Sequence, residues 1–163
     1  MENQIENKNF EIIVRKAVIE DINQIAKLDI ENEKENLKEN LKENLKEEVV
    51  ENGIKFLIEN PKFGSFFVAE NSGKIIGFYM INFEWSDWRN GMFWWLNKLF
   101  IQKEFRTEKI YSKFHQFVKD FAIKTKAVGF RSCIPKKNIE TQKIFEELGM
   151  KEVDYYAFED IFN

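Results

Sequence analysis

The sequence predicts a mixed α/β fold, with a mostly antiparallel sheet of six to seven strands flanked by about four helices. Two observations support this fold class. Two runs rich in β-branched and aromatic residues, 65–70 and 74–83, flank an Asn-Ser-Gly triplet, which is typical of a tight hairpin between antiparallel strands. Further along, a segment with apolar residues at helical spacing separates strand-like runs at 92–102 and 127–134, which predicts a crossover helix within the same sheet.

The elements before the hairpin are expected to be one strand and two helices. β-branched residues predict a first strand over 10–16. Glu20 and Asp21 suit the positive first turn of the helix that follows, and its apolar residues recur at helical spacing. A further helix is expected over 49–60, where the same spacing continues through a glycine.

Between these helices lies the only low-complexity repeat of the chain, Glu-Asn-Leu-Lys over 35–46. Leu37, Leu41 and Leu45 recur every four residues, so on a helix they form one narrow apolar line surrounded by Glu and Lys. We interpret the repeat as a solvated helix that contacts the core through this leucine line. The alternative is a lid or a helix that binds a partner.

After the hairpin, a loop is expected over 84–91. The run 92–102 is almost wholly apolar and is therefore expected to form a central strand. A short helix over 137–150 is expected to end at Gly149, which suits a helix C-cap. One last strand, or two, is expected over 151–162.

Length and composition narrow the class of protein. The chain has 163 residues, 44% of them hydrophobic, which suits one domain over 10–163 after a loose polar N-terminus at 1–9. A net charge of −3 without a long basic run argues against a nucleic-acid partner. No apolar run approaches the roughly 20 residues that cross a bilayer, so no membrane partner is expected. One His and one Cys predict no metal site built on these ligands, and the lone Cys fits a cytoplasmic protein.

Four conspicuous side chains have ordinary structural interpretations. His115 lies beside the apolar line of the crossover helix and is expected at its surface or half-buried. Cys133 is interpreted as a small buried hydrophobe rather than a nucleophile, because no His pairs with it in sequence. Trp94 and Trp95 are expected to pack within the strand and the core.

Four segments, in order and over nearly the whole chain from about residue 10 to 160, resemble the GNAT superfamily of N-acetyltransferases. They are VRKAVIEDINQIAKL (14–28), FFVAENSGKIIGFYMI (66–81), LNKLFIQKEFRTEKIYSKF (96–114) and NIETQKIFEELGM (138–150). The third resembles the family's acetyl-CoA motif, in which a strand precedes a phosphate-binding turn. The resemblance implies a single GNAT-like domain whose sheet splays apart between the strands at 92–102 and 127–134 to leave a cleft for acetyl-CoA.

The motif departs from the family pattern where the cofactor should come closest. Lys109 and Tyr111 stand in place of the two motif glycines, and Thr107 stands where a glycine often follows Arg106. These changes add bulk but leave the backbone N–H donors of a helix start in place. By the resemblance, the cofactor-binding residues are Leu99, Phe100, Ile101, Arg106, Thr107, Glu108, Lys109, Ile110, Tyr111, Ser112 and Asn138. Asn138 is also a good helix N-cap.

The catalytic residues stay unknown, because Phe145 stands where the family carries the Tyr that protonates the leaving thiolate. Phe has no proton to give. The alternative proton donors to the thiolate are Tyr79, Tyr155 or a water. The candidate bases that would take the proton of the amine are Glu84, Asp87 and Glu70.

Three residues are candidates for binding the acceptor: Trp85, Trp88 and Asn97. Family geometry would place the acceptor at the loop that carries the two Trp residues. Asn97 and Lys98 stand where many polyamine-type members carry an acidic pair.

The resemblance therefore implies an N-acetyltransferase that transfers an acetyl group from acetyl-CoA to the amine of a small molecule or peptide. The alternative is a GNAT-fold protein that has lost catalysis and serves as a ligand-binding or protein-interaction module. Dimers are common in the family, so a homodimer is an open expectation. The sequence does not name the acceptor, because the fold alone does not fix function.

Overall fold

The computed structural model describes residues 11–36 and 46–162, which fall into two compact units. The first unit ends at Cys133 and the second begins at Ile134. The expectation of one domain over 10–163 stays a prediction. Residues 37–45, which hold all three leucines of the Glu-Asn-Leu-Lys repeat, lie outside the described residues, so both interpretations of that repeat stay open.

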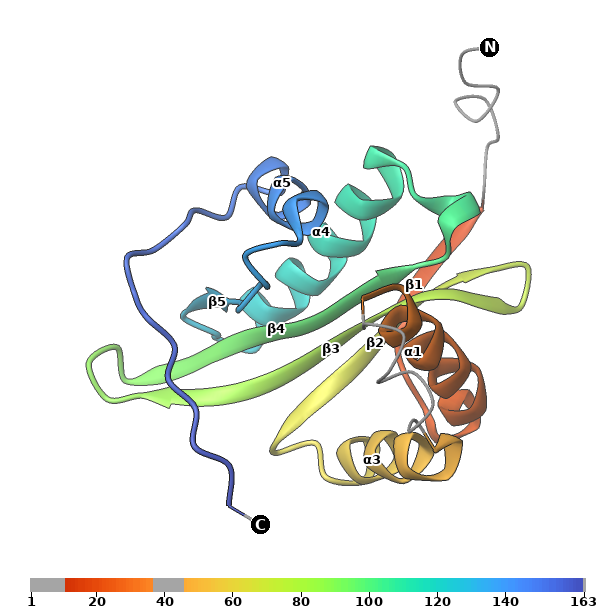
Figure 1. The fold of residues 1–163 in the computed structure, drawn as a ribbon, viewed down its shortest axis with the longest axis horizontal. Coiled ribbons are helices and arrows are strands. Elements are labelled where there is room, and N and C mark those ends of the chain that lie inside the picture. The colour runs from red at the N-terminus through yellow and green to blue at the C-terminus, as the bar shows by residue number, and fades with distance from the viewer. Residues whose placement is uncertain (1–10, 37–45, 163) are drawn as a thin grey trace. The chain divides into compact units, whose positions relative to one another are not determined.

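A five-stranded sheet of order β1-β2-β3-β4-β5 forms the framework of the first unit (Figure 1). Its strands are β1 (Ile12–Lys16), β2 (Gly64–Asn71), β3 (Lys74–Ser86), β4 (Gly91–Ile101) and β5 (Gly129–Arg131). Neighbouring strands are antiparallel except β4 and β5, which are parallel. The mixed, mostly antiparallel α/β fold is confirmed. The expected six to seven strands are not confirmed, since the described chain has five.

Helices cover both faces of this sheet (Figure 1). On one face lie α1 (Ile22–Asn36), which follows the short 3-10 turn η1 (Ile19–Asp21), and α3 (Glu47–Glu59). On the other face lies α4 (Glu108–Lys124), which follows the 3-10 turn η2 (Lys103–Phe105). The α1 and α3 face buries Ile25, Ala26, Ile54, Leu57, Phe78 and Phe100 in one cluster. On the α4 face, the ring of Phe67 lies 5.3 Å from that of Phe121 and 6.0 Å from that of Trp94.

The two hairpins differ in how well their sequence predicts them. In the turn between β2 and β3, Ser72 and Gly73 have φ angles of 51° and 79°, which confirms the tight turn expected from Asn-Ser-Gly. The loop expected over 84–91 is wrong at its start, because β3 continues to Ser86. Glu84 pairs in register with Phe93, so backbone pairing with β4 extends the strand through polar residues that were predicted to form a loop.

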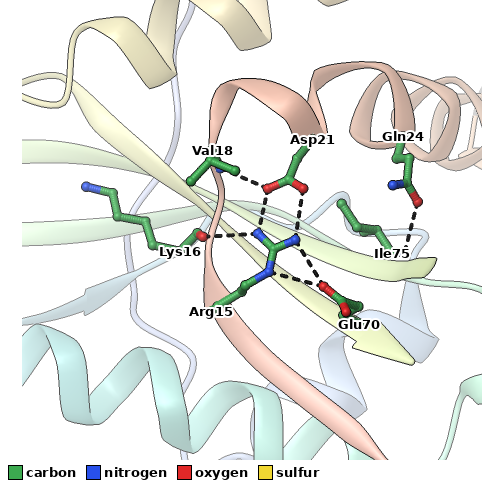
Figure 2. A network of polar contacts seen from close by, with 7 residues as sticks. All are labelled: Arg15, Lys16, Val18, Asp21, Gln24, Glu70 and Ile75. Atoms are coloured by element: carbon green, nitrogen blue, oxygen red, sulfur yellow. Dashed lines mark hydrogen bonds and ion pairs between the residues drawn. The ribbon is translucent and has the colours of Figure 1, made fainter. Parts of the chain in front are cut away.

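A partly buried ion pair fixes the start of α1 to the sheet (Figure 2). Arg15 on β1 donates two hydrogen bonds to Asp21, of 2.6 and 2.9 Å, and also donates to Glu70 on β2 at 3.0 Å. The Val18 N–H donates to Asp21 at 2.8 Å. Burial alone would raise the pKa of Asp21, but the hydrogen bonds from Arg15 and Val18 outweigh it and hold that pKa below its usual value. This network engages Glu70, one of the candidate bases, in a structural role.

The second unit contains α5 (Ile139–Glu147). The Asn138 side chain accepts a hydrogen bond from Thr141 N–H at 3.1 Å, so Asn138 is an N-cap as expected. Gly149 has a φ of 86°, which fits its predicted place at the helix end. The strand predicted over 151–162 is absent, because these residues form neither helix nor strand. A strand-like pattern expresses a preference for extended backbone, and it forms a strand only where another strand supplies hydrogen bonds.

Candidate functional site

The most conspicuous feature of the first unit is the point where β4 and β5 diverge. The two strands pair only from Phe93 to Trp95, opposite Gly129 to Arg131. The strand expected over 127–134 is thus shorter than predicted, and β4 continues alone on this side to Ile101. Ser132 Oγ donates to the Leu96 carbonyl at 2.7 Å just past the last pair. We call the side of β4 that faces away from β3, from Leu96 to Ile101, the open edge.

Two of the three backbone positions predicted to bind the cofactor lie on this open edge. Gln102 N–H donates to the Ile76 carbonyl on β3 at 2.8 Å. Because backbone groups alternate sides along an antiparallel strand, Phe100 also faces β3, whereas Leu99 and Ile101 turn their N–H and C=O groups outward. Beyond Trp95, no strand in the described ranges pairs with this edge.

The start of α4 offers two backbone donors beside the end of β4. Thr107 is the N-cap, and its Oγ1 accepts from Ile110 N–H at 3.3 Å. The N–H groups of Thr107 and Tyr111 are bound to the carbonyls of Phe105 and Thr107. Within residues 11–36 and 46–162, this leaves only Glu108 and Lys109 in the first turn with no assigned acceptor for their N–H groups. Such groups, at the positive end of a helix, can bind an anion.

Arg106 does not point its charge outward from this turn. Its Nε donates to the Ile101 carbonyl at 2.7 Å, and its guanidinium donates to Glu35 at the end of α1 at 2.6 Å. The guanidinium also lies over the ring of Phe100, 5.3 Å from its centre. Arg106, the side chain of the turn whose charge best suits phosphate binding, is therefore bound to α1 and to the open edge.

The other residues of the predicted phosphate turn divide by burial. Ile110 is only 5% exposed and belongs to the core, while the side chains of Lys109 and Ser112 are exposed. Tyr111 is partly buried, one turn into the helix. Between β4 and η2, the buried Oε1 of Gln102 has no hydrogen-bond partner within the described parts of the chain. An unpaired buried carbonyl of this kind costs about 1–3 kcal/mol, so a ligand donor there would be favourable.

Tyr79 on β3 and His115 on the buried face of α4 lie together, away from solvent. Tyr79 is fully buried, and its hydroxyl lies 3.2 Å from His115 Nδ1. Burial, with a smaller effect of Lys119, lowers the pKa of His115 to about 4, and burial also raises the pKa of Tyr79. The expectation that His115 lies at the surface or half-buried is wrong, since it is 4% exposed. The apolar residues of this helix do not show in sequence how much of its surface is buried, so they did not predict that His115 lies inside.

Glu84 belongs to a cluster that spans three strands at the point of divergence. One of its carboxylate oxygens accepts from the Arg131 guanidinium at 2.7 Å, and the other accepts from the indole N–H of Trp95 at 2.5 Å. The Arg131 guanidinium lies over the ring of Phe93, 3.9 Å from its centre. Sequence reasoning missed Phe93 and Arg131, because they meet Glu84 only through strand pairing: the antiparallel register of β3 and β4 sets Phe93 opposite Glu84, and the parallel register of β4 and β5 brings Arg131 beside them.

The acceptor candidates are spread along the hairpin of β3 and β4. Trp85 is 58% exposed, and Trp88, in the turn, is 95% exposed. Asn97 is at an irregularity in β4 and bonds through its side chain to Asn82 on β3. The candidate base Asp87 accepts from Trp88 N–H at 2.8 Å within the turn. By contrast, Trp94 is buried, which confirms its predicted packing role.

Lys98, next to Asn97, is held by two carboxylates of α1. Its Nζ lies 2.8 Å from Asp29 and 3.0 Å from Glu33. Burial would lower the pKa of Lys98, but the two carboxylates outweigh it, and the pKa is raised. Lys98 therefore stays charged at neutral pH and fixes α1 to β4.

The remaining sequence candidates lie at or beyond the end of the first unit. Cys133 is exposed, so its interpretation as a small buried hydrophobe is wrong. It follows the end of β5 at Arg131, where the alternation of a strand no longer turns it inward. Phe145 and the N-cap Asn138 belong to α5, and Tyr155 lies in the segment after it.

The described residues offer neither a membrane-spanning helix nor a metal cluster. None of their helices is both long and apolar enough to cross a membrane. Within the same residues, no group of three or more His, Cys, Asp or Glu side chains is placed to hold a metal ion.

Comparison with known proteins bears on the family of this chain. The family model of the GNAT acetyltransferases matches residues 23–150. Among solved structures, a possible acetyltransferase from Clostridium difficile 630 is 31% identical, with a TM-score of 0.82 over 93% of this chain and 98% of that one. No curated protein sequence matches significantly.

Two more distant structures share the fold. The aminoglycoside N-acetyltransferase AAC(6')-Iy in complex with CoA is 14% identical, with a TM-score of 0.76 over 95% of this chain and 97% of that one. A predicted acetyltransferase with acetyl-CoA from Clostridium acetobutylicum is also 14% identical, with a TM-score of 0.74 over 91% and 96% of the two chains. The matched family model and the C. difficile structure show that the chain belongs to the GNAT acetyltransferase family.

Proposed function

We propose that this protein is an N-acetyltransferase that transfers an acetyl group from acetyl-CoA to the amine of a small molecule or peptide. The observation that carries the proposal is the open edge of β4, with the outward backbone groups of Leu99 and Ile101. Next to it, two N–H groups at the start of α4 have no acceptor among the residues that the structure describes. Membership of the family and the CoA and acetyl-CoA bound to two structural neighbours support it.

The residues at this edge fit acetyl-CoA in kind. Leu99 and Ile101 would bind the amide groups of the pantetheine arm through their backbone, as a neighbouring strand would. Glu108 and Lys109 would bind the pyrophosphate through their N–H groups, with Lys109 adding a positive side chain.

The reaction needs little more than alignment of two groups and the removal of one proton. The acceptor nitrogen attacks the thioester carbonyl carbon, the carbon–sulfur bond breaks, and the nitrogen loses a proton as the thiolate gains one. Holding the two reactants in line can supply roughly 7–11 kcal/mol. Phe145 cannot protonate the thiolate, and such general acid help is typically worth about 10²–10⁴ in rate. We therefore expect a slow enzyme in which water or another donor protonates the thiolate.

None of the candidate bases is assigned. The two oxygens of Glu84 already accept from Arg131 and Trp95, and Glu70 accepts from Arg15. Tyr79 is fully buried beneath α4, which argues against it as the proton donor. We also propose a cytoplasmic location, which the lone Cys supports. A homodimer is proposed as well, because dimers are common in the family.

A second function, a ligand-binding or interaction module without catalysis, is favoured by one specific contact. Arg106 is already paired with Glu35 and the Ile101 carbonyl, which leaves less positive charge for a pyrophosphate. Phe145 adds to this alternative because it removes the usual acid.

Calorimetry and a thiol assay separate the two functions. Acetyl-CoA and a desulfo-CoA analogue are titrated into the full chain, and release of free CoA thiol is then followed with a panel of amines. Binding together with amine-dependent thiol release supports the acetyltransferase. Absence of heat at millimolar acetyl-CoA would refute acetyl-CoA binding, and binding without thiol release from any amine would favour the module.

A further inference from the structure

The side-chain cluster of Glu84, Phe93, Trp95 and Arg131 lies at the vertex where β4 and β5 part. Trp95 and Arg131 are the last register pair before the strands diverge. Asn97, at the irregularity of β4, follows Trp95 by two residues. A ligand group that lies between the two diverging strands would therefore end at this vertex.

The cluster lies on the face of the sheet opposite α4. Trp94 and Phe130, the pair before Trp95 and Arg131, contact each other and the α4 side, with ring centres 6.3 Å apart. Because side chains alternate along a strand, Trp95 and Arg131 point to the other face. There the hairpin end of β3 and β4 extends beyond α1 and α3, as Figure 1 shows. The side chains of Arg131 and Glu84 are each 42% exposed, so a small molecule can reach them.

The local sequence holds the Arg131 guanidinium in a fixed plane. A side chain at position 129 would lie 2.9 Å from Cε1 of Phe93, so Gly129 leaves room for that ring beside β5. The guanidinium rests over the ring, 3.9 Å from its centre, and Glu84 binds one of its terminal nitrogens. Trp95 in turn fixes the other oxygen of Glu84. The arginine is thus oriented from three strands.

This orientation leaves donors unused. A guanidinium has five N–H groups, and within the described chain only the bond to Glu84 is assigned to Arg131. Its remaining N–H groups lie in the plane of the guanidinium, which matches a carboxylate in a two-point contact. Glu84 lies beside it and would repel a doubly charged phosphate more strongly than a singly charged carboxylate. Each oxygen of Glu84 keeps a lone pair for an ammonium or amine.

We infer that Arg131, positioned by Glu84 and Phe93, binds the carboxylate of the acceptor, so that the acceptor is an amine that carries a carboxylate, of the amino-acid class. The inference rests on the proposed acetyltransferase function and narrows its substrate. Arg131 is a specificity residue in this role, and Glu84 is a positioning residue. A surface ion pair without such a role would contribute little to stability and nothing to substrate choice.

The test uses matched acceptors, the standard amino acids and their carboxamides, with CoA thiol release as the readout. We expect the wild-type chain to use at least one free acid with a kcat/KM about 10-fold or more above that of its carboxamide. The amine of the carboxamide is less basic than the amine of the free acid, so less of it is protonated. A preference for the acid would therefore not arise from amine protonation. Arg131→Gln should reduce this ratio to near one by raising KM for the acid, without changing the carboxamide.

Two further variants and one NMR spectrum serve as controls for this result. Arg89→Gln removes the other guanidinium near Phe93, which is 5.6 Å from its ring centre, and should leave the ratio unchanged. Arg131→Lys, which keeps the charge but not the planar donor set, should retain only part of the preference. In the presence of CoA, a preferred acid should also shift the Trp95 indole N–H resonance of the wild-type chain.

Failure of this inference differs from failure of the proposed function. Thiol release with amines that lack a carboxylate, at rates equal to those with the acids, overturns the inference and leaves the acetyltransferase in place. An acid preference that Arg131→Gln does not alter also overturns it, as does a panel in which no acid releases thiol or shifts the indole resonance. Absence of acetyl-CoA binding overturns the proposed function itself.

Discussion

The guanidinium of Arg106 and the carboxylate of Glu35 form an ion pair at 2.6 Å that joins the turn before α4 to the end of α1. The Arg106 side chain is 21% exposed and that of Glu35 is 40% exposed, so the pair is partly accessible to solvent. A pyrophosphate bound at the start of α4 would compete with Glu35 for this guanidinium. In the proposed acetyltransferase, the contact would link acetyl-CoA affinity to the end of α1.

Replacing Glu35 with Gln should strengthen acetyl-CoA binding. The change removes the competing carboxylate while keeping the size of the side chain, and we expect about a 3- to 10-fold lower Kd, with a steeper salt dependence. Calorimetry of wild type and variant at two ionic strengths measures both effects. Glu59→Gln, in the exposed α3 pair with Lys55, is the matched control and should leave Kd unchanged. Equal or weaker binding by Glu35→Gln would contradict the competition.

Tyr111 gives a second, steric prediction for the same ligand. Tyr111→Ala removes the ring from the first turn of α4 and should lower the Kd for acetyl-CoA about 10-fold if the ring narrows the approach to the N–H groups of Glu108 and Lys109. Tyr111→Phe keeps the ring and should bind like the wild type. If both variants bind alike, the ring is not what restricts the cofactor.

The Arg15–Asp21 pair predicts a loss of stability rather than of binding. Asp21→Asn removes the charge that Arg15 and the Val18 N–H satisfy, and should lower the free energy of unfolding at pH 7 by about 2–3 kcal/mol. Because the folded state lowers the pKa of Asp21, this stabilisation is complete above the unfolded value of 3.8 and is lost as pH falls through the folded pKa. The gap between wild type and variant in urea unfolding should thus close in acid. Glu20→Gln, on the exposed side of the same turn, serves as control.

His115 predicts a different pH window. Its pKa is about 4 in the folded chain and about 6.5 when unfolded, so the unfolded state binds the extra proton between these values. Stability is complete above pH 6.5 and should fall by roughly 2–3 kcal/mol on acidification to pH 4 because of this one group. His115→Gln should lose that part of the slope. Urea unfolding of both chains between pH 4 and 7.5 checks it, and parallel curves would contradict the assigned burial of the imidazole.

Local signals predicted the parts of this fold that depend on a few neighbouring residues. The Asn-Ser-Gly turn, the Asn138 cap and the place of Gly149 at the end of α5 each depend on backbone geometry within a few positions. Apolar residues at helical spacing predicted α4, and the almost wholly apolar run 92–102 predicted β4 to within one residue at each end. In these cases the residue type and the conformation it favours are sufficient.

The misses depend on contacts between distant segments. The pairing of Glu84 with β4, the burial of His115 on the inner face of α4 and the exposure of Cys133 after a short β5 all depend on neighbours that are distant in sequence. In the candidate site, the resemblance assigned the cofactor to the strand end 99–101, the turn 106–112 and Asn138. It could not show that Arg106 meets Glu35 across 71 positions or that Arg131 lies over Phe93.

The central claim, that acetyl-CoA binds at the open edge of β4 and the start of α4, is tested most directly by amide NMR on the isotope-labelled chain. During an acetyl-CoA titration, the amide resonances of Leu99, Ile101, Glu108 and Lys109 should show the largest shifts, while those of β1, at the far side of the sheet, should stay in place. Binding that leaves these four amides unmoved, or no binding at millimolar acetyl-CoA, would contradict the account.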